Sequence, residues 1–337
     1  MVLTLLPCIE PAGIKGLANR GRGTYPWGAG STLNLTNSLR QRNLTNTPFP
    51  MTQPESNSSV LSRLAVCSWS LRPVDPAGLA RQLSDIGLRL TQLDLDPLRE
   101  NPAVWGDLRA VLADAGIRAI SGMFRTVGED YTSLETIRRT GGLVPDGTWA
   151  QNWQNLQQTA RNAQQLGLDI VMTHAGFLPH ETSDPAFDKM LGRMRQVARL
   201  FADHGLTLCC ETGQESAESL VSFLDQLAEP NVAVNFDPAN MLLYNNGDPI
   251  AALRTIGHRV KSCHLKDAKV TQVPGTWGEE VPVGTGQVDW PAFFVTMADI
   301  GFGGYYCFER EAGSPRGADI AAGWKFVQHL LEPQPKS

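Results

Sequence analysis

The sequence predicts an α/β protein, a (β/α)8 TIM barrel preceded by a disordered N-terminal extension. From residue 62 onward one unit recurs eight times: a short apolar run, a loop, an amphipathic segment and a glycine. Eight such units in about 270 residues match the size of a TIM barrel. Several runs are almost continuously apolar, as expected of strands buried on both faces of a parallel sheet. No Gly-x-Gly-x-x-Gly follows the first run, which disfavours a doubly wound open sheet.

The eight expected strands are short apolar runs that end in polar residues. They are residues 64–69, 89–95, 118–124, 169–174, 206–211, 232–237, 259–265 and 305–310. Helix starts share an N-cap residue followed by proline, as in Asp75-Pro76, Asn101-Pro102, Asp184-Pro185 and Asp248-Pro249. Helix ends share a glycine suited to the left-handed position after the last turn, namely Gly87, Gly116, Gly167, Gly205, Gly257 and Gly301.

Residues 1–61 differ from the rest of the chain, because they are rich in Asn, Thr, Ser, Pro and Gly and lack hydrophobic periodicity. We expect a disordered extension here and a catalytic barrel domain over residues 62–332. Met51 is an alternative start, with residues 1–50 as a mis-annotated segment, and a transit peptide is the minor alternative. The first residues lack the basic start of a signal peptide.

Composition excludes several classes of function. The net charge of −5 and the pI of about 5.7 argue against a nucleic-acid binder or a protein of anionic membrane surfaces. No apolar run reaches the roughly 20 residues of a membrane span. The six cysteines contain no C-x-x-C, which favours buried, reduced thiols and a cytoplasmic location.

Two connections are long, residues 125–146 after the third expected strand and residues 268–288 after the seventh. Both lie on the side of a barrel where strands lead into helices and active sites form. We expect them to form walls or lids over a pocket.

Four consecutive late strands end in side chains that bind metals: Glu211, Asp237, His264 and Glu309. Adjacent barrel strands lie about 4.8 Å apart, so inward-pointing side chains at these ends should converge. Three carboxylates at one point repel each other unless a cation lies among them. With one imidazole they form a ligand set for a divalent ion, with Mn²⁺ favoured and Mg²⁺, Co²⁺ or Zn²⁺ as alternatives.

These residues, with the phrases NFDPAN (235–240), HLKD (264–267) and VGTGQVDW (283–290), resemble the xylose-isomerase-like TIM barrels. This sugar phosphate isomerase/epimerase superfamily includes tagatose-type ketose 3-epimerases, hydroxypyruvate isomerase and inosose dehydratases. The resemblance covers about residues 62–332. It implies a small carbohydrate substrate and a homo-oligomer, since dimers or tetramers are usual among similar barrels.

The resemblance also implies a mechanism, in which the metal acidifies a C–H beside a carbonyl and stabilises the enediolate formed on proton loss. Glu211 and Glu309 are then both metal ligands and the proton-transfer pair, one on each face of the substrate. Asp237 and His264 are ligands only. His264 should be neutral, with its other ring nitrogen held by a neighbouring group.

Four further residues are candidates for substrate binding. His174 ends the fourth strand and can donate to substrate hydroxyls, or neighbouring backbone groups satisfy its hydrogen bonds. Lys266 can neutralise an enediolate or an anionic substrate group, or it pairs with Asp267 or Glu309. Trp69 at the end of the first strand can stack on a sugar. Asn240 stands where some relatives carry a substrate-binding histidine, which weighs against a tagatose-type epimerase.

The leading interpretation is a divalent-metal-dependent isomerase or epimerase of a sugar, keto-sugar or inositol derivative. An inosose-type dehydratase, a lyase, is the alternative at the same site. An AP-endonuclease-like nuclease is a distant alternative, because it needs a histidine-rich trinuclear zinc cluster. A barrel that only binds a sugar conflicts with the presence of both Glu211 and Glu309.

Overall fold

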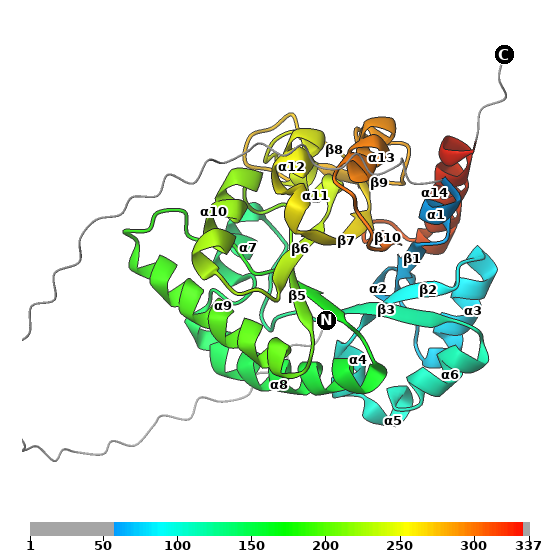
Figure 1. Cartoon of the computed structure of the whole chain (residues 1–337), viewed down its shortest axis with the longest axis horizontal. Helices are drawn as coiled ribbons and strands as arrows, with labels where there is room; N and C mark the ends of the chain where they lie inside the picture. Colours follow the sequence, from blue (N-terminus) through cyan, green and yellow to red (C-terminus); the bar gives the residue numbers. More distant parts are fainter. Residues whose placement is uncertain (1–56, 333–337) are drawn as a thin grey trace, which may run out of the picture. The chain divides into compact units, whose positions relative to one another are not determined.

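The computed structural model describes residues 57–332, which form a closed barrel of eight parallel strands surrounded by helices (Figure 1). Around the barrel the strands follow the order β1-β10-β7-β6-β5-β4-β3-β2. They are β1 Leu64–Cys67, β2 Leu90–Asp94, β3 Arg118–Met123, β4 Ile170–Thr173, β5 Thr207–Glu211, β6 Val232–Phe236, β7 Val260–Leu265 and β10 Tyr306–Phe308. Each lies within one of the expected runs, so the predicted fold class is confirmed.

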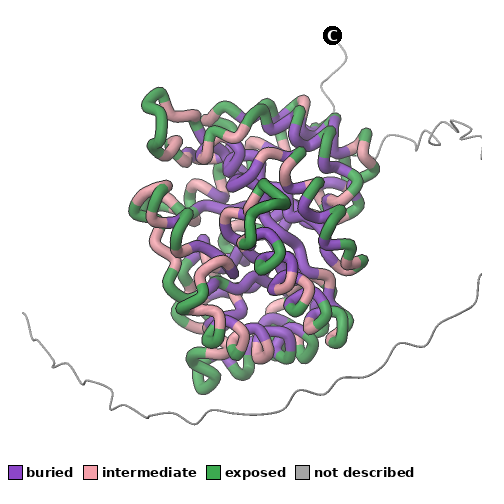
Figure 2. The backbone as a smooth tube through the Cα atoms, turned by 90° about the vertical axis from the view of Figure 1, so that its left-hand side faces the viewer, coloured by how far each residue is buried: buried purple, intermediate pink, exposed green. Residues whose placement is uncertain are grey.

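The helices cover the outside of the barrel (Figure 1). They are α1 Asn57–Leu61, α2 Ser68–Leu71, α3 Pro76–Ile86, α4 Asp96–Glu100, α5 Pro102–Trp105, α6 Leu108–Asp114, α7 Leu134–Thr140, α8 Asp146–Leu166, α9 Pro185–Asp203, α10 Ala217–Leu227, α11 Pro238–Leu243, α12 Pro249–Ile256, the 3₁₀ turn η1 Gly257–Arg259, α13 Trp290–Asp299 and α14 Arg316–Leu331. The main apolar core joins strands to these helices, as where Phe236 of β6 stacks on Phe293 of α13. Figure 2 shows this inner buried layer, with exposed backbone mainly at the periphery. None of the described helices is long and apolar enough to cross a membrane.

The predicted helix starts are largely confirmed. Asp75, Asp184 and Asp248 each accept a backbone hydrogen bond from the first turn of α3, α9 and α12, at 2.6, 2.8 and 2.7 Å. Asn101 is the N-cap of α5 with Pro102 at N1, as predicted, but its side chain makes no capping hydrogen bond. Asn101 (φ −138°, ψ 63°) is also the C-cap of the preceding helix α4, so one residue ends α4 and begins α5.

Among the six glycines predicted to stop helices, Gly257 is the exception. The other five have positive φ, as expected, whereas Gly257 has φ −52° and begins the 3₁₀ turn η1. A Cβ at this position would lie 2.7 Å from Cγ2 of Ile300. Close packing against α13's C-terminal end, and not a left-handed turn, therefore requires glycine here.

The structured part begins before residue 62. Asn57–Leu61 form α1, and the Asn57 amide donates a hydrogen bond to the carbonyl of Leu331 at the end of α14. The expected disorder is therefore wrong for residues 57–61, which form a helix that contacts the end of α14. The predictions for residues 1–56, including a start at Met51, lie outside the described residues.

Both long connections contain secondary structure that the sequence pattern did not reveal. The first contains α7, which begins with a capping box between Ser133 and Thr136. The second contains an antiparallel pair, β8 Asp267–Lys269 and β9 Glu279–Val281. These short elements make the connections ordered structures at the carboxyl ends of β3 and β7.

Candidate metal-binding active site

Four neighbouring strands bring Glu211, Asp237, His264 and Glu309 to one point. Glu211 is the last residue of β5, Asp237 follows β6, His264 lies near the end of β7, and Glu309 follows β10. These strands are consecutive in the barrel, so their carboxyl ends are adjacent. One ligand atom from each residue lies within 4.8 Å of all the others, and all four residues are buried. The geometry thus joins the four residues that the sequence singled out as metal ligands.

The imidazole of His264 lies at the centre of this group. Its Nδ1 is 2.6 Å from Oε1 of Glu211, 3.2 Å from Oε2 of Glu309 and 3.6 Å from Oδ2 of Asp237. Burial lowers the pKa of His264, but the negative charges around it, Glu309 foremost, raise this pKa well above its ordinary value. The three carboxylates therefore strongly favour a positive charge, from a proton or a cation, at Nδ1.

The other nitrogen of His264 is held from across the barrel by Gln92 of β2. Nε2 lies 2.8 Å from Oε1 of Gln92, which can only accept, so Nε2 carries the proton when the ring is neutral. That tautomer leaves Nδ1 with a lone pair facing the carboxylates, as a metal ligand requires. Gln92 is the neighbouring group whose existence the sequence predicted but whose identity it did not reveal.

Oδ2 of Asp237 and Nδ1 of His264 are buried and make no well-aligned hydrogen bond, although Nδ1 lies 2.6 Å from Oε1 of Glu211 and Oδ2 lies 3.8 Å from Nζ of Lys266. The other oxygen of Asp237 accepts from the N–H groups of Ala239 and Asn240, at 2.8 and 3.0 Å, and so caps α11. Buried polar atoms are rarely left without partners. A carboxylate oxygen and an imidazole nitrogen that face one point, with two more carboxylates beside them, fit a divalent ion.

Lys266 connects Glu309 of the candidate metal site to the neighbouring side chains of Glu311 and Asn240. Its Nζ lies 2.9 Å from Oε2 of Glu309, 2.7 Å from Oε2 of Glu311 and 3.5 Å from Oδ1 of Asn240. The expected alternative for Lys266, an ion pair with Glu309, is present. Burial raises the pKa of Glu309, but the charges of Lys266 and His264 outweigh it and hold this pKa well below its usual range.

The prediction that Trp69 ends the first strand is wrong. Strand β1 stops at Cys67, and Trp69 belongs to the short helix α2. The helical turn directs its indole Nε1 to Oε1 of Glu309, at 2.7 Å. Trp69 thus contacts a candidate catalytic carboxylate, a polar role that stacking on a sugar would not require.

His174, directly after β4, is half-buried and places Nε2 2.8 Å from Oε2 of Glu211. Burial lowers the pKa of His174, but the charge of Glu211 raises it to about 9. In return, burial raises the pKa of Glu211, and the charges of His174 and His264 lower it to about 2. Tyr131, from the first long connection, meets His174 edge-on with ring centroids 6.4 Å apart. This connection therefore forms part of the wall, as expected.

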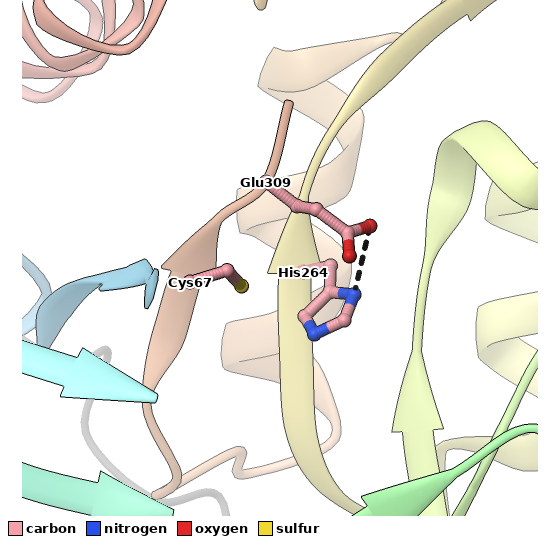
Figure 3. Close-up of side chains that lie close together, drawn as sticks. All are labelled: Cys67, His264 and Glu309. Atoms are coloured by element: carbon pink, nitrogen blue, oxygen red, sulfur yellow. Dashed lines mark ion pairs between the residues drawn. The ribbon is translucent and has the colours of Figure 1, made fainter. Parts of the chain in front are cut away.

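Cys67 lies on a different side of the imidazole of His264 from the ion pair with Glu309 (Figure 3). Its thiol donates to Oε1 of Gln92 at 3.4 Å, the same oxygen that holds His264. Burial, first among several causes, raises the pKa of Cys67 well above its ordinary value. Cys67 is therefore a neutral thiol that helps orient Gln92.

Known proteins similar to this chain share its barrel fold. Residues 80–330 match the family model described as the xylose isomerase-like TIM barrel. A curated relative, an uncharacterized Escherichia coli protein named YihM, is 32% identical over 96 residues, which span 28% of this chain and only 29% of that protein. A xylose isomerase domain protein from Planctomyces limnophilus is 31% identical, with a TM-score of 0.71 over 79% of this chain and 95% of that one.

Two more distant structures share the fold. One is a xylose isomerase-like TIM barrel protein from Mycobacterium smegmatis in complex with magnesium (17% identity, TM-score 0.61, 82% of this chain and 98% of that one). The other is D-psicose 3-epimerase with D-tagatose from Clostridium cellulolyticum H10 (17% identity, TM-score 0.60, 80% of this chain and 100% of that one). Because the family model spans most of the sequence and the barrel is closed, the chain belongs to the xylose isomerase-like TIM barrel family.

Proposed function

We propose that this protein is a divalent-metal-dependent isomerase or epimerase of a sugar, keto-sugar or inositol derivative. The observation that carries the proposal is the convergence of three buried carboxylates on Nδ1 of His264, at 2.6, 3.2 and 3.6 Å, with one ligand atom of each residue within 4.8 Å of the others. Glu211, Asp237, His264 and Glu309 would hold the ion. Gln92 would keep His264 in the tautomer that presents Nδ1.

An ion bound here would polarise a substrate carbonyl and stabilise the negative charge that develops when the neighbouring C–H proton is removed. Glu211 and Glu309 are the proton-transfer groups. Neighbouring cations hold both pKa values low, so both carboxylates are ionised at neutral pH and each can act as a base. They come from β5 and β10, with β6 and β7 between them, which suits attack on two sides of one bound substrate.

Epimerisation also requires a proton donor on the face opposite the base. Nζ of Lys266, 2.9 Å from Oε2 of Glu309, keeps that carboxylate ionised, because burial lowers the pKa of Lys266 but the carboxylates around it hold that pKa well above its ordinary value. His174 plays the corresponding part for Glu211, at 2.8 Å. Each glutamate therefore has its own cationic partner, which is consistent with two proton-transfer groups and not one.

The comparisons support the proposal by analogy of fold. D-Psicose 3-epimerase is built on a similar barrel, and so is the Mycobacterium smegmatis protein in complex with magnesium. Because one fold hosts many reactions, the proposal depends on the site itself.

The decisive experiment measures metal-dependent incorporation of solvent deuterium into a panel of keto-sugars and inososes. Glu211→Gln and Glu309→Gln should each reduce exchange by about 10²–10⁴-fold while circular dichroism stays unchanged. Glu218→Gln, an exposed position on α10, is the matched control and should retain full activity. If both site variants retained activity, the assignment of the proton-transfer pair would be refuted.

Dehydration is the second candidate reaction, and Lys266 is the observation that favours it. A buried ammonium beside Glu309 can protonate a departing hydroxyl once the neighbouring carbon has lost its proton. Mass spectrometry separates the two reactions, because dehydration removes water from the product, whereas epimerisation leaves the product mass unchanged in ordinary water.

A further inference from the structure

A cavity of about 290 Å³ lies beside the candidate metal centre, toward the carboxyl ends of β1, β2 and β3. Trp69 and Glu311 line it, and both also contact the centre. Trp69 donates to Glu309, and Glu311 accepts from Lys266. A ligand in this cavity would therefore be adjacent to the proposed proton-transfer groups, and the volume suits a small molecule.

The cavity wall carries three arginines, Arg72, Arg125 and Arg316, and two carboxylates, Asp94 and Glu311. Arg125 is neutralised by Asp94 and Asp96, at 3.0 and 3.2 Å. The salt bridges of the described residues include none from Arg72 or Arg316. Within residues 57–332, the side chain of Arg316 donates a hydrogen bond only to the carbonyl of Gly313, at 3.3 Å. Two guanidinium groups thus line the cavity without a carboxylate partner.

These two guanidinium groups also act on each other. Burial, and next the charge of Arg72, lower the pKa of Arg316, although the charges of Glu311 and Glu280 partly oppose this. Arg72 and Arg316 also line a second cavity of about 350 Å³, so both residues are shared by the two cavities. Like charges held near each other are stabilised by an anion between them, and arginine's planar fork matches carboxylate and phosphate oxygens.

The backbone of Arg72 supports a functional role for this side chain. Arg72 ends α2 in the left-handed conformation, with φ 49° and ψ 49°. Glycine adopts this conformation without the steric cost that an L-residue bears. The same short helix carries Trp69, three positions before Arg72, and the indole of Trp69 contacts Glu309.

We propose that the substrate carries an anionic group, a carboxylate or a phosphate, which Arg72 and Arg316 bind while the rest of the molecule reaches the metal centre. This inference rests on the proposed function, since it names the substrate class of the same site. The shared chemistry is a small polyhydroxylated anion, a sugar acid or a sugar phosphate. Neutral keto-sugars would leave the two guanidinium groups without a partner.

Anion binding can be tested separately from turnover. Binding of inorganic phosphate and of malonate is measured by calorimetry on full-length protein treated with a chelator. The chelator removes any metal ion, so the anion cannot coordinate an ion at the centre. Arg72→Gln and Arg316→Gln should each weaken binding at least about tenfold, as expected for loss of a charge-assisted hydrogen bond. Arg254→Gln, an exposed position on α12, is the matched control and should bind as the unmodified protein does. Preference for phosphate or for malonate identifies the anionic group.

Turnover of the Mn²⁺-loaded protein provides the second measurement, with neutral keto-sugars, sugar acids and sugar phosphates compared by deuterium exchange. We expect anionic substrates to be preferred, and both arginine variants to raise their KM with little change in kcat. Two outcomes overturn the inference while the proposed function stands. In the first, neutral keto-sugars react and their kcat/KM is the same in the unmodified protein and in both arginine variants. In the second, neither anion binds although a substrate exchanges deuterium. If no substrate exchanges deuterium but anion binding requires both arginines, the proposed function fails and the anion site stands.

Discussion

Asp267 organises the connection that follows β7, and its replacement by asparagine tests how. The carboxylate is 1% exposed and accepts five hydrogen bonds. Oδ2 accepts from the N–H groups of Gly284 and Gly286 and from the indole of Trp290, at 2.9, 3.0 and 3.0 Å. Oδ1 accepts from the N–H groups of Ala268 and Val288, at 2.9 and 3.2 Å. The HLKD and VGTGQVDW phrases are thus two halves of one hydrogen-bonded structure.

An asparagine side chain has one acceptor oxygen where the carboxylate has two. If the amide oxygen replaces Oδ2 and keeps three donors, the NH₂ group faces the N–H groups of Ala268 and Val288. Each buried donor left without an acceptor costs about 1–3 kcal/mol, so Asp267→Asn should lower the free energy of unfolding by about 2–6 kcal/mol. At roughly 2 °C per kcal/mol, the melting temperature should fall by about 4–12 °C.

The measurement is thermal or urea denaturation followed by circular dichroism. Asp248→Asn is the matched control, because Asp248 caps α12 at an exposed position where asparagine is an equally good cap. Gly286→Ala should resemble Asp267→Asn, since a Cβ there would clash with the Asp267 carboxylate. A loss below about 0.5 kcal/mol in Asp267→Asn, no larger than in the control, would refute this account.

Three further outcomes follow from the site. Gln92→Leu should weaken binding of Mn²⁺ about 10–100-fold in calorimetry, because His264 loses the acceptor at Nε2, and unchanged affinity would contradict that role. Burial raises the pKa of Glu215 from 4.5 to about 8, so its neutral form stabilises the fold below pH 4.5 and that contribution is lost as pH rises through 8. Glu215→Gln keeps an acceptor for the N–H of Leu178. It should raise the free energy of unfolding at pH 9 by up to about 4 kcal/mol and leave it unchanged at pH 4. Equal effects at both pH values would exclude a buried charge at this position. A chelator should abolish turnover and Mn²⁺ or Co²⁺ should restore it, so full activity in the presence of chelator would rule out the metal.

Much of the fold and the centre of the site could be predicted from sequence because their signals are local. Apolar runs, Asp-Pro pairs and glycines mark strands and helix ends within a few residues of each other. Parallel strands in a closed barrel end at one level, so Glu211, Asp237, His264 and Glu309 could be assembled from strand order alone. Their roles in metal binding and proton transfer stay predictions.

The remainder depends on contacts between distant segments. Gln92 meets His264 across 172 positions, and its position inside an apolar run gives no sign of that contact. Trp69 reaches Glu309 because a short helix replaces the expected end of the first strand, and α1 is held by a contact with Leu331. The barrel and the four inward-facing side chains follow from periodicity and chain order, which are readable in the sequence. The groups that orient these side chains, and the cavity that Arg72 and Arg316 share, emerge only in the folded chain, because residues far apart in sequence carry no local signal of their proximity.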